Sequence, residues 1–169
     1  MEKAKILKDI IESRRSIYPK SYTQEELSGD IISEILNAAS FAPNHKKTKP
    51  WRFKVFRGEE KDQLGIQLSE IYKATKNPQA FLEKKYTDIQ NKAFRSGAIV
   101  TICVNFSGIV PEWEEIAATA MAVQNMYLTA TAHEIGCYWS SHEAINDLGD
   151  YLNLQDNQKC IGLFYLGTT

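Results

Sequence analysis

AIVTICVN, residues 98–105, is continuously apolar and rich in β-branched side chains. Strands that are covered on both faces have this pattern, so the segment is predicted to be a buried central strand of a sheet. Before it, residues 51–55 alternate aromatic or apolar with basic side chains, which predicts a second strand that is closed by Gly58. After it, residues 136–140 and 160–166 have the composition of two further strands.

Helical patterns fill most of the chain between these strands. The predicted helices span residues 3–13, 31–39, 59–94 with a break at Asn77-Pro78, 114–132 and 143–152. Asp30 is the predicted N-cap of the second helix. The helix at 114–132 carries many alanines, so we expect it to pack closely on more than one side. This order of elements predicts an α+β sandwich, with a mixed, mostly antiparallel sheet flanked by helices.

The 169 residues are expected to form one domain, residues 1–169. The chain has 20 basic and 21 acidic residues and a net charge of −1, which gives no electrostatic reason to expect nucleic acid or a membrane surface as a partner. No apolar segment approaches the roughly 20 residues that cross a bilayer. Cys103, Cys137 and Cys160 lie in apolar strand-like segments and form no CxxC pair, so we expect buried free thiols and a cytoplasmic protein.

Arg14-Arg15-Ser16 closes the first predicted helix. Two guanidinium groups and a hydroxyl can bind a phosphate, because the planar guanidinium donates two parallel hydrogen bonds to phosphate oxygens. The alternative is that both arginines only complement the negative end of the helix dipole. From its chemistry alone the triplet is a weak candidate for an anion site.

The loop from Asn44 to Lys49 carries His45 and three lysines directly before an aromatic strand. Cationic and hydrogen-bonding groups beside an apolar wall suit a nucleotide or flavin. For Lys46 and Lys47 a solvated basic turn is the better interpretation, whereas Asn44 and His45 remain candidates for binding a cofactor.

Trp139, Ser140 and Ser141 stand at the end of the strand at 136–140. Backbone N–H groups at a strand end are free to donate to the nitrogen and oxygen atoms of a ring-shaped cofactor. In the alternative interpretation Trp139 is a core aromatic residue, and the serines cap the helix at 143–152.

Other chemistries are not indicated. The three histidines have no metal-ligand spacing, so no metal site is expected. The sequence contains no GxSxG, P-loop or GxGxxG motif. Cys137 follows His133 by four residues, but its apolar surroundings favour an inert thiol over a nucleophile.

Together, these segments resemble the nitroreductase family. The resemblance begins with Arg14-Arg15-Ser16 after an amphipathic helix and continues with APNHK at 42–46 and PWRF at 50–53. AVQNMYL at 122–128 and IGCYW at 135–139 are similar to the central helix of the family and the strand after it. The match covers nearly the whole chain in the order of the family, and the Pro-Asn-His-Lys loop resembles that of its small members.

The resemblance implies an intertwined homodimer with one FMN at each of two subunit interfaces. The Arg14–Ser16 triplet would hold the phosphate and ribityl chain of FMN. The backbone of Trp139–Ser141 would lie along the isoalloxazine ring. His45 would reach the flavin from the partner subunit, with Asn44 beside it in the site.

The resemblance also implies a ping-pong oxidoreductase. NADH or NADPH would reduce FMN by hydride transfer and leave, and a small acceptor such as a nitroaromatic compound or a quinone would enter the same cleft. No side-chain acid or base is required, because the flavin carries the chemistry. Two other functions stay open on this fold: an FMN-binding sensor or flavin carrier with little turnover, and an enzyme that degrades or dehalogenates a specific substrate.

Overall fold

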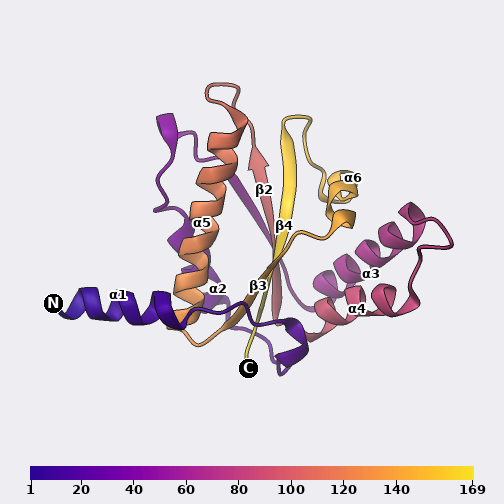
Figure 1. Ribbon diagram of the computed structural model, residues 1–169, viewed down its shortest axis with the longest axis horizontal. Helices are drawn as coiled ribbons and strands as arrows, with labels where there is room; N and C mark the ends of the chain where they lie inside the picture. The colour runs from indigo at the N-terminus through magenta and orange to yellow at the C-terminus, as the bar shows by residue number, and fades with distance from the viewer.

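The computed structural model describes residues 1–169 as a four-stranded sheet with helices against both faces (Figure 1). The strands are β1 (Trp51–Phe56), β2 (Ala98–Asn105), β3 (Gly136–Ser140) and β4 (Gln158–Gly167). The helices are α1 (Glu2–Ser13), α2 (Gly29–Ala39), α3 (Gly58–Thr75), α4 (Glu83–Arg95), α5 (Glu112–Ala132) and α6 (Gly149–Leu152). Short 3-10 turns occupy Pro19–Ser21, His45–Lys47 and Glu143–Asp147.

The sheet has the strand order β1-β2-β4-β3, and its three pairings are antiparallel. The predicted α+β sandwich is confirmed. Its sheet, expected to be mixed and mostly antiparallel, is antiparallel at every pairing. β2 lies inside the sheet between β1 and β4, and its first seven residues are buried, as its continuous apolar pattern predicts.

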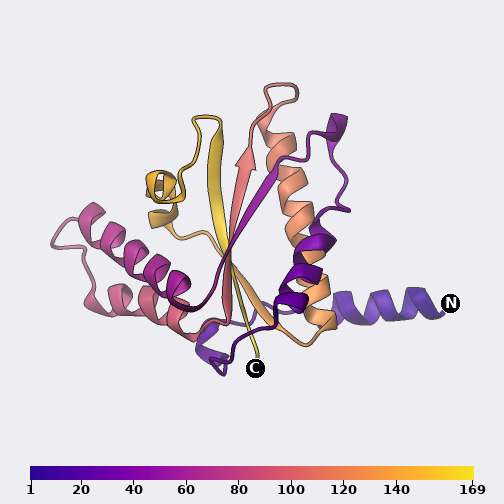
Figure 2. The same ribbon diagram turned by 180° about the vertical axis from the view of Figure 1, so that it is seen from behind.

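Each face of the sheet has its own apolar cluster. One cluster of 17 buried residues joins the sheet to α2 and α5, which lie side by side in Figure 2. The other cluster, of 16 buried residues, joins the opposite face to α3, α4 and the Glu143–Asp147 turn. None of the helices combines the length and the apolar character that a membrane span requires.

The start of α2 differs from the prediction. Ser28 is the N-cap, and its Oγ accepts a hydrogen bond from the backbone N–H of Ile31 at 3.2 Å. The prediction of Asp30 as the cap is therefore wrong. Asp30 lies in the first turn, where its carboxylate is still favoured by the positive end of the helix dipole.

Two other predicted helices need correction at their ends. α5 begins at Glu112, two residues before the predicted start. The stretch 143–152 is divided into a 3-10 turn and the four-residue α6. Gly58, the predicted end of a strand, opens α3 with a φ of +49°, a conformation that glycine adopts without strain.

The helix α1 projects from the body of the molecule (Figure 1). None of its residues is buried, although Ile6, Leu7 and Ile11 follow a helical apolar pattern. These three side chains are about half exposed, at 52%, 52% and 49%. The apolar face of this helix is therefore left uncovered by the rest of the chain.

Candidate functional site

Helix α1 ends at Ser13, and the residues after its C-cap, Arg14, run beside β3. The backbone N–H of Ile17 donates to the carbonyl oxygen of Cys137 at 3.0 Å. This bond fixes the residues just after α1 against the strand that begins at Gly136. Segments that are more than a hundred residues apart in the sequence are thereby placed side by side.

Tyr127, on α5, lies at the centre of this region. Its hydroxyl accepts a hydrogen bond from the backbone N–H of Trp139 at 2.7 Å and lies 3.5 Å from Oγ of Ser16. The guanidinium carbon of Arg14 lies 5.2 Å from the centre of the Tyr127 ring, within cation–π range. Burial raises the pKa of Tyr127, so the hydroxyl keeps its proton at neutral pH. The structure thus brings Arg14, Ser16 and Trp139 together around a residue that the sequence had not singled out.

Arg15 has different contacts. Its Nη1 donates to the carbonyl oxygens of Glu12 at 2.7 Å and Arg14 at 2.8 Å, so it satisfies backbone acceptors at the end of α1. Its side chain also lines a separate hollow of about 540 Å³ together with His133 and Thr168. The alternative role of complementing a helix end therefore applies to Arg15, whereas Arg14 and Ser16 meet at Tyr127.

At Trp139 the structure supports the interpretation as a core aromatic residue, because its side chain packs against the cluster under α2 and α5 and its backbone N–H is already bonded. The indole of Trp139 packs over Gly162, where an added Cβ would lie 1.8 Å from the indole Nε1. Its backbone N–H, in contrast, is directed to Tyr127. Ser140 is buried and Ser141 is exposed. The alternative that these serines cap the following turn is wrong, because the cap is His142.

A hollow of about 580 Å³ lies between the segment after Arg14–Ser16 and α4. Its charged lining consists of four basic residues and one acidic residue: Lys20, Lys85, Lys92, Arg95 and Asp88. Tyr18 forms an aromatic wall by packing against Tyr138 with 4.5 Å between the ring centres. Nζ of Lys92 lies 5.6 Å from the centre of the Tyr138 ring, and burial lowers the pKa of this lysine. Aromatic side chains and positive charge together suit a planar ring that bears electronegative atoms.

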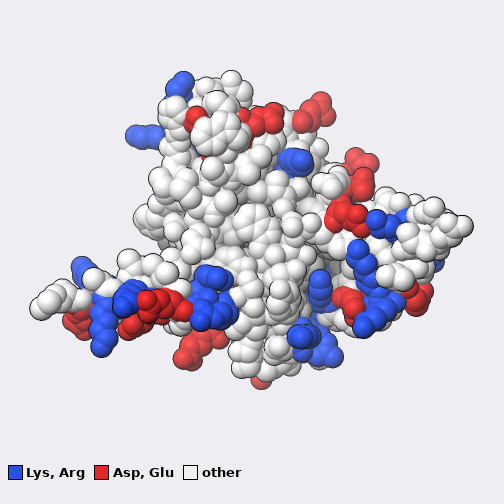
Figure 3. Space-filling view, viewed as in Figure 1, with Lys and Arg blue, Asp and Glu red and all other residues white.

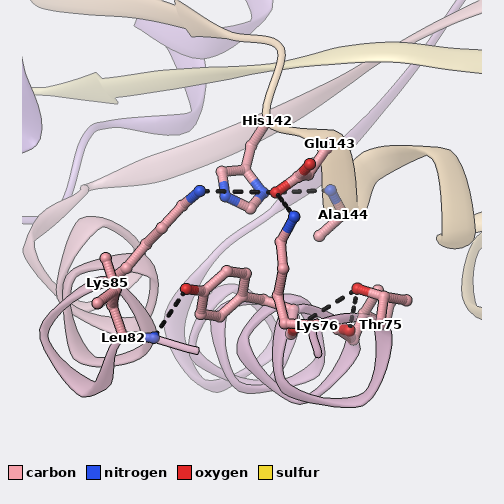
Figure 4. Close-up of polar contacts among 9 residues, drawn as sticks. Thr75, Lys76, Leu82, Lys85, His142, Glu143 and Ala144 are labelled. Atoms are coloured by element: carbon pink, nitrogen blue, oxygen red, sulfur yellow. Dashed lines mark hydrogen bonds and ion pairs between the residues drawn. The ribbon is translucent and has the colours of Figure 1, made fainter. Parts of the chain in front are cut away.

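Ion pairs join the lobe formed by α3 and α4 to the Glu143–Asp147 turn that follows β3 (Figure 4). The carboxylate of Glu143 lies 2.7 Å from Nζ of Lys76 and 3.6 Å from Nζ of Lys85. The hydrogen bond from Lys76 lowers the pKa of Glu143. These contacts hold the lysine-rich side of the hollow in place against the residues that follow Ser141.

His142, also drawn in Figure 4, lines the same hollow. Its Nδ1 accepts a hydrogen bond from the backbone N–H of Ala144 at 3.2 Å, which places the proton of the neutral ring on Nε2. Nε2 is buried and has no hydrogen-bond partner. Burial first, and then the charge of Lys85, lowers the pKa of His142. The ring is therefore neutral at pH 7 and carries an unpaired donor.

Asn44 and His45 lie elsewhere in the chain. Nδ1 of His45 is 2.6 Å from the carboxylate of Glu114, in the first turn of α5. Oδ1 of Asn44 accepts a hydrogen bond from the backbone N–H of Lys49. Glu114 and Tyr127 are 13 positions apart on α5, or roughly 20 Å at 1.5 Å per residue. A single chain thus does not bring Asn44 and His45 to the Tyr127 cluster, and their delivery by a partner subunit stays a prediction.

Sequence reasoning missed Tyr127 and the hollow for different reasons. Tyr127 could have been found, because a tyrosine on the packed side of an alanine-rich helix needs a partner for its hydroxyl. The lysines of α4 gave no such signal, since they resemble any solvated helical face. Only the packing of α4 beside Tyr18 and His142 groups them into one surface.

Comparison with known proteins gives a consistent result. The family model of the "Nitroreductase family" matches residues 11–168. A Bacillus subtilis (strain 168) protein named "Putative NAD(P)H nitroreductase YfhC" is 28% identical over 165 residues, which cover 96% of this chain and 84% of that protein. YdjA of Escherichia coli (strain K12), which has the same descriptive name, is 28% identical over 145 residues, covering 83% of this chain and 77% of YdjA.

A solved structure shares the fold. The protein from Desulfovibrio desulfuricans, crystallised in complex with FMN, superposes with a TM-score of 0.72 and 26% sequence identity. The alignment covers 95% of this chain and 84% of that protein. The match of the family model over nearly the entire chain confirms the resemblance inferred from the sequence. The chain belongs to the nitroreductase family.

Proposed function

We propose that the protein is an FMN-dependent oxidoreductase that uses NADH or NADPH to reduce nitroaromatic compounds, quinones or similar small acceptors. The main support is that Arg14, Ser16 and the Trp139 backbone meet at Tyr127. A hollow with an aromatic and cationic lining lies on the α4 side of the same sheet. The names of YfhC and YdjA, and the FMN in the Desulfovibrio complex, support the same chemistry.

The donor set of this region fits FMN. A guanidinium group and a hydroxyl are suited to a phosphate, so Arg14 and Ser16 would hold that end, with Arg15 adding positive charge. The Trp139–Ser141 segment would lie along the isoalloxazine ring, and Lys92 would face the electronegative edge of that ring. His142 supports this fit, because a buried donor without a partner is costly unless a ligand or ordered water accepts its hydrogen bond.

FMN would carry out the hydride transfer, and the protein would position it. FMN, when bound, supplies the hydride-accepting and hydride-donating centre. Arg14 and Ser16 would fix the position of the cofactor, and Tyr127 would hold Ser16 and the Trp139 backbone in register with each other. The lysine-lined side of the hollow favours anionic or electron-rich ligands.

The complete site would require two chains. Besides the exposed apolar side chains of α1, three apolar residues of α5 are exposed: Trp113, Ile116 and Met121, at 68%, 40% and 41%. Figure 3 shows charged side chains over α1 and over the α3–α4 lobe, with a largely uncharged face between them. A second copy covering this face would form a homodimer and could bring its Asn44 and His45 to the flavin.

The proposal is tested with the purified protein under anaerobic conditions. We expect flavin absorption, or uptake of added FMN, followed by bleaching with NADPH or NADH and recovery of colour on addition of a nitroaromatic compound or a quinone. Initial rates at several fixed acceptor concentrations should give the parallel double-reciprocal lines of a ping-pong reaction. Failure to bind FMN would refute the proposal. FMN binding without bleaching by either nicotinamide would instead support the sensor or flavin carrier.

A further inference from the structure

Two of the three buried free cysteines lie opposite each other in the sheet. Cys103 of β2 and Cys160 of β4 are direct partners across the antiparallel pairing of these strands. Residues that are directly opposite in an antiparallel pair have Cα atoms about 4.5 or 5.5 Å apart. Both distances fall inside the roughly 4.4–6.8 Å that a disulfide spans.

The two thiols also lie on the same side of the sheet. A bulge interrupts the pairing, so that Ile102 faces Gly162 while the next residue, Cys103, faces Cys160. Both cysteines belong to the apolar cluster under α3 and α4, whereas Ile161 packs against the cluster on the other face. The bulge thus leaves the side chains of the pair on one face, where they interact.

We propose that Cys103 and Cys160 are a cross-strand dithiol that hydrogen peroxide oxidises to a disulfide and a dithiol reductant reopens. This site is separate from the Tyr127 cluster and does not depend on the proposed flavin chemistry. The third cysteine, Cys137 of β3, is buried and has no cysteine partner.

A small oxidant has a route to the pair. Both cysteines are only 3% exposed, which excludes large reagents. Cys160, however, lines a hollow of about 190 Å³ together with Ser141, His142 and Lys159. A molecule of the size of hydrogen peroxide fits such a space.

The oxidation is balanced in two steps. Sulfur of Cys160 attacks one oxygen of hydrogen peroxide and the O–O bond breaks. The leaving hydroxide takes the thiol proton of Cys160, which gives a sulfenic acid and one water. Sulfur of Cys103 then attacks the sulfenic sulfur, the S–O bond breaks, and a second water leaves with the thiol proton of Cys103. Two electrons pass from the two thiols to the peroxide.

The order of the two steps follows from access, because Cys160 and not Cys103 lines the hollow. A hydrogen bond from the Cys160 thiol lowers the pKa of Cys103, while the neighbouring Cys103 and burial raise the pKa of Cys160. Because Cys160 is protonated at neutral pH, the first step is slow, and millimolar peroxide is the appropriate dose.

Thiol counting by mass spectrometry tests the proposal on the folded protein with its cofactor. The protein is exposed to millimolar hydrogen peroxide, freed of oxidant, unfolded and alkylated. The reduced protein should take up three alkyl groups and the oxidised protein one, on Cys137. Peptide mapping should find Cys103 joined to Cys160, and dithiothreitol should restore all three reactive thiols.

Matched variants separate this pair from general oxidation. The Cys137→Ser variant should still form the cross-link, and its oxidised form should unfold at a higher temperature than its reduced form. Cys103→Ser and Cys160→Ser should form no intramolecular disulfide. Three alkylated cysteines in the peroxide-treated wild-type protein would overturn the proposal, as would a cross-link that involves Cys137. Neither result depends on whether Cys103→Ser and Cys160→Ser fold, because both are obtained with the wild-type protein.

Discussion

Replacing Tyr127 with phenylalanine tests whether this residue organises the site. The change removes one oxygen atom and keeps the ring, which packs edge-on against Phe164 with 4.8 Å between the ring centres. The backbone N–H of Trp139 loses its 2.7 Å hydrogen bond, and Ser16 loses its neighbouring hydroxyl. A buried N–H without a partner costs about 1–3 kcal/mol. At about 2–4 °C per kcal/mol for a chain of this size, the Tm should fall by about 2–12 °C.

FMN affinity should fall in the same variant, because the two segments proposed to bind the phosphate and the ring would lose their link through Tyr127 and keep only the Ile17–Cys137 backbone hydrogen bond. A loss of about 1.4 kcal/mol corresponds to about tenfold in Kd, which titration of FMN fluorescence can resolve. Tyr72→Phe is the matched control, since the Tyr72 hydroxyl accepts a hydrogen bond from the backbone N–H of Leu82 at 3.1 Å. It should lower the Tm but leave the Kd within about twofold, less than 0.5 kcal/mol. Wild-type Tm and Kd in Tyr127→Phe would refute the reasoning.

Three further predictions concern Arg14, Gly162 and His142. Arg14→Ala should weaken FMN binding about 10- to 150-fold, the equivalent of about 1.5–3 kcal/mol for a charged hydrogen bond. Arg15→Ala should change the Kd for FMN about threefold or less, because its Nη1 already donates to backbone carbonyls. Equal changes of Kd in the two arginine variants would contradict these different roles. In urea unfolding, Gly162→Ala should lower the free energy of unfolding by about 1–3 kcal/mol, because the added Cβ displaces the indole of Trp139. Gly149→Ala is the control and should be nearly neutral, because a Cβ added there meets nothing within 4 Å. Burial lowers the pKa of His142, so its stabilising effect is complete above its unfolded pKa of about 6.5 and is lost as the pH falls through the lower folded-state pKa. His142→Asn, which keeps a capping side chain, should therefore show a smaller drop in Tm between pH 7 and pH 5, and an unchanged pH profile would contradict the assignment.

Local patterns were sufficient for most of the fold. The continuous apolar stretch of β2 predicted its central place in the sheet, and the break at Asn77-Pro78 falls between α3 and α4. The local pattern does not decide where α2 starts, for a physical reason. Ser28 and Asp30 are both good capping residues two positions apart, and the choice depends on how the preceding loop approaches the helix.

The candidate site was only partly visible in the sequence, because much of it is made by long-range contacts. Arg14, Ser16 and Trp139 could be selected by residue type and by resemblance to a family. Their common neighbour Tyr127 depends on how α5 packs between the end of α1 and β3. The placement of His45 beside Glu114, far from that cluster, could not be inferred from a loop motif at all.

A crystal structure of the protein with FMN bound would test the proposed site most directly. Two copies of the chain should surround each flavin, with the phosphate at Arg14 and Ser16 and the isoalloxazine ring along Trp139–Ser141. The His45 near this flavin should belong to the partner chain. A phosphate bound instead among Lys85, Lys92 and Arg95, or a flavin held by one chain alone, would contradict the proposed site.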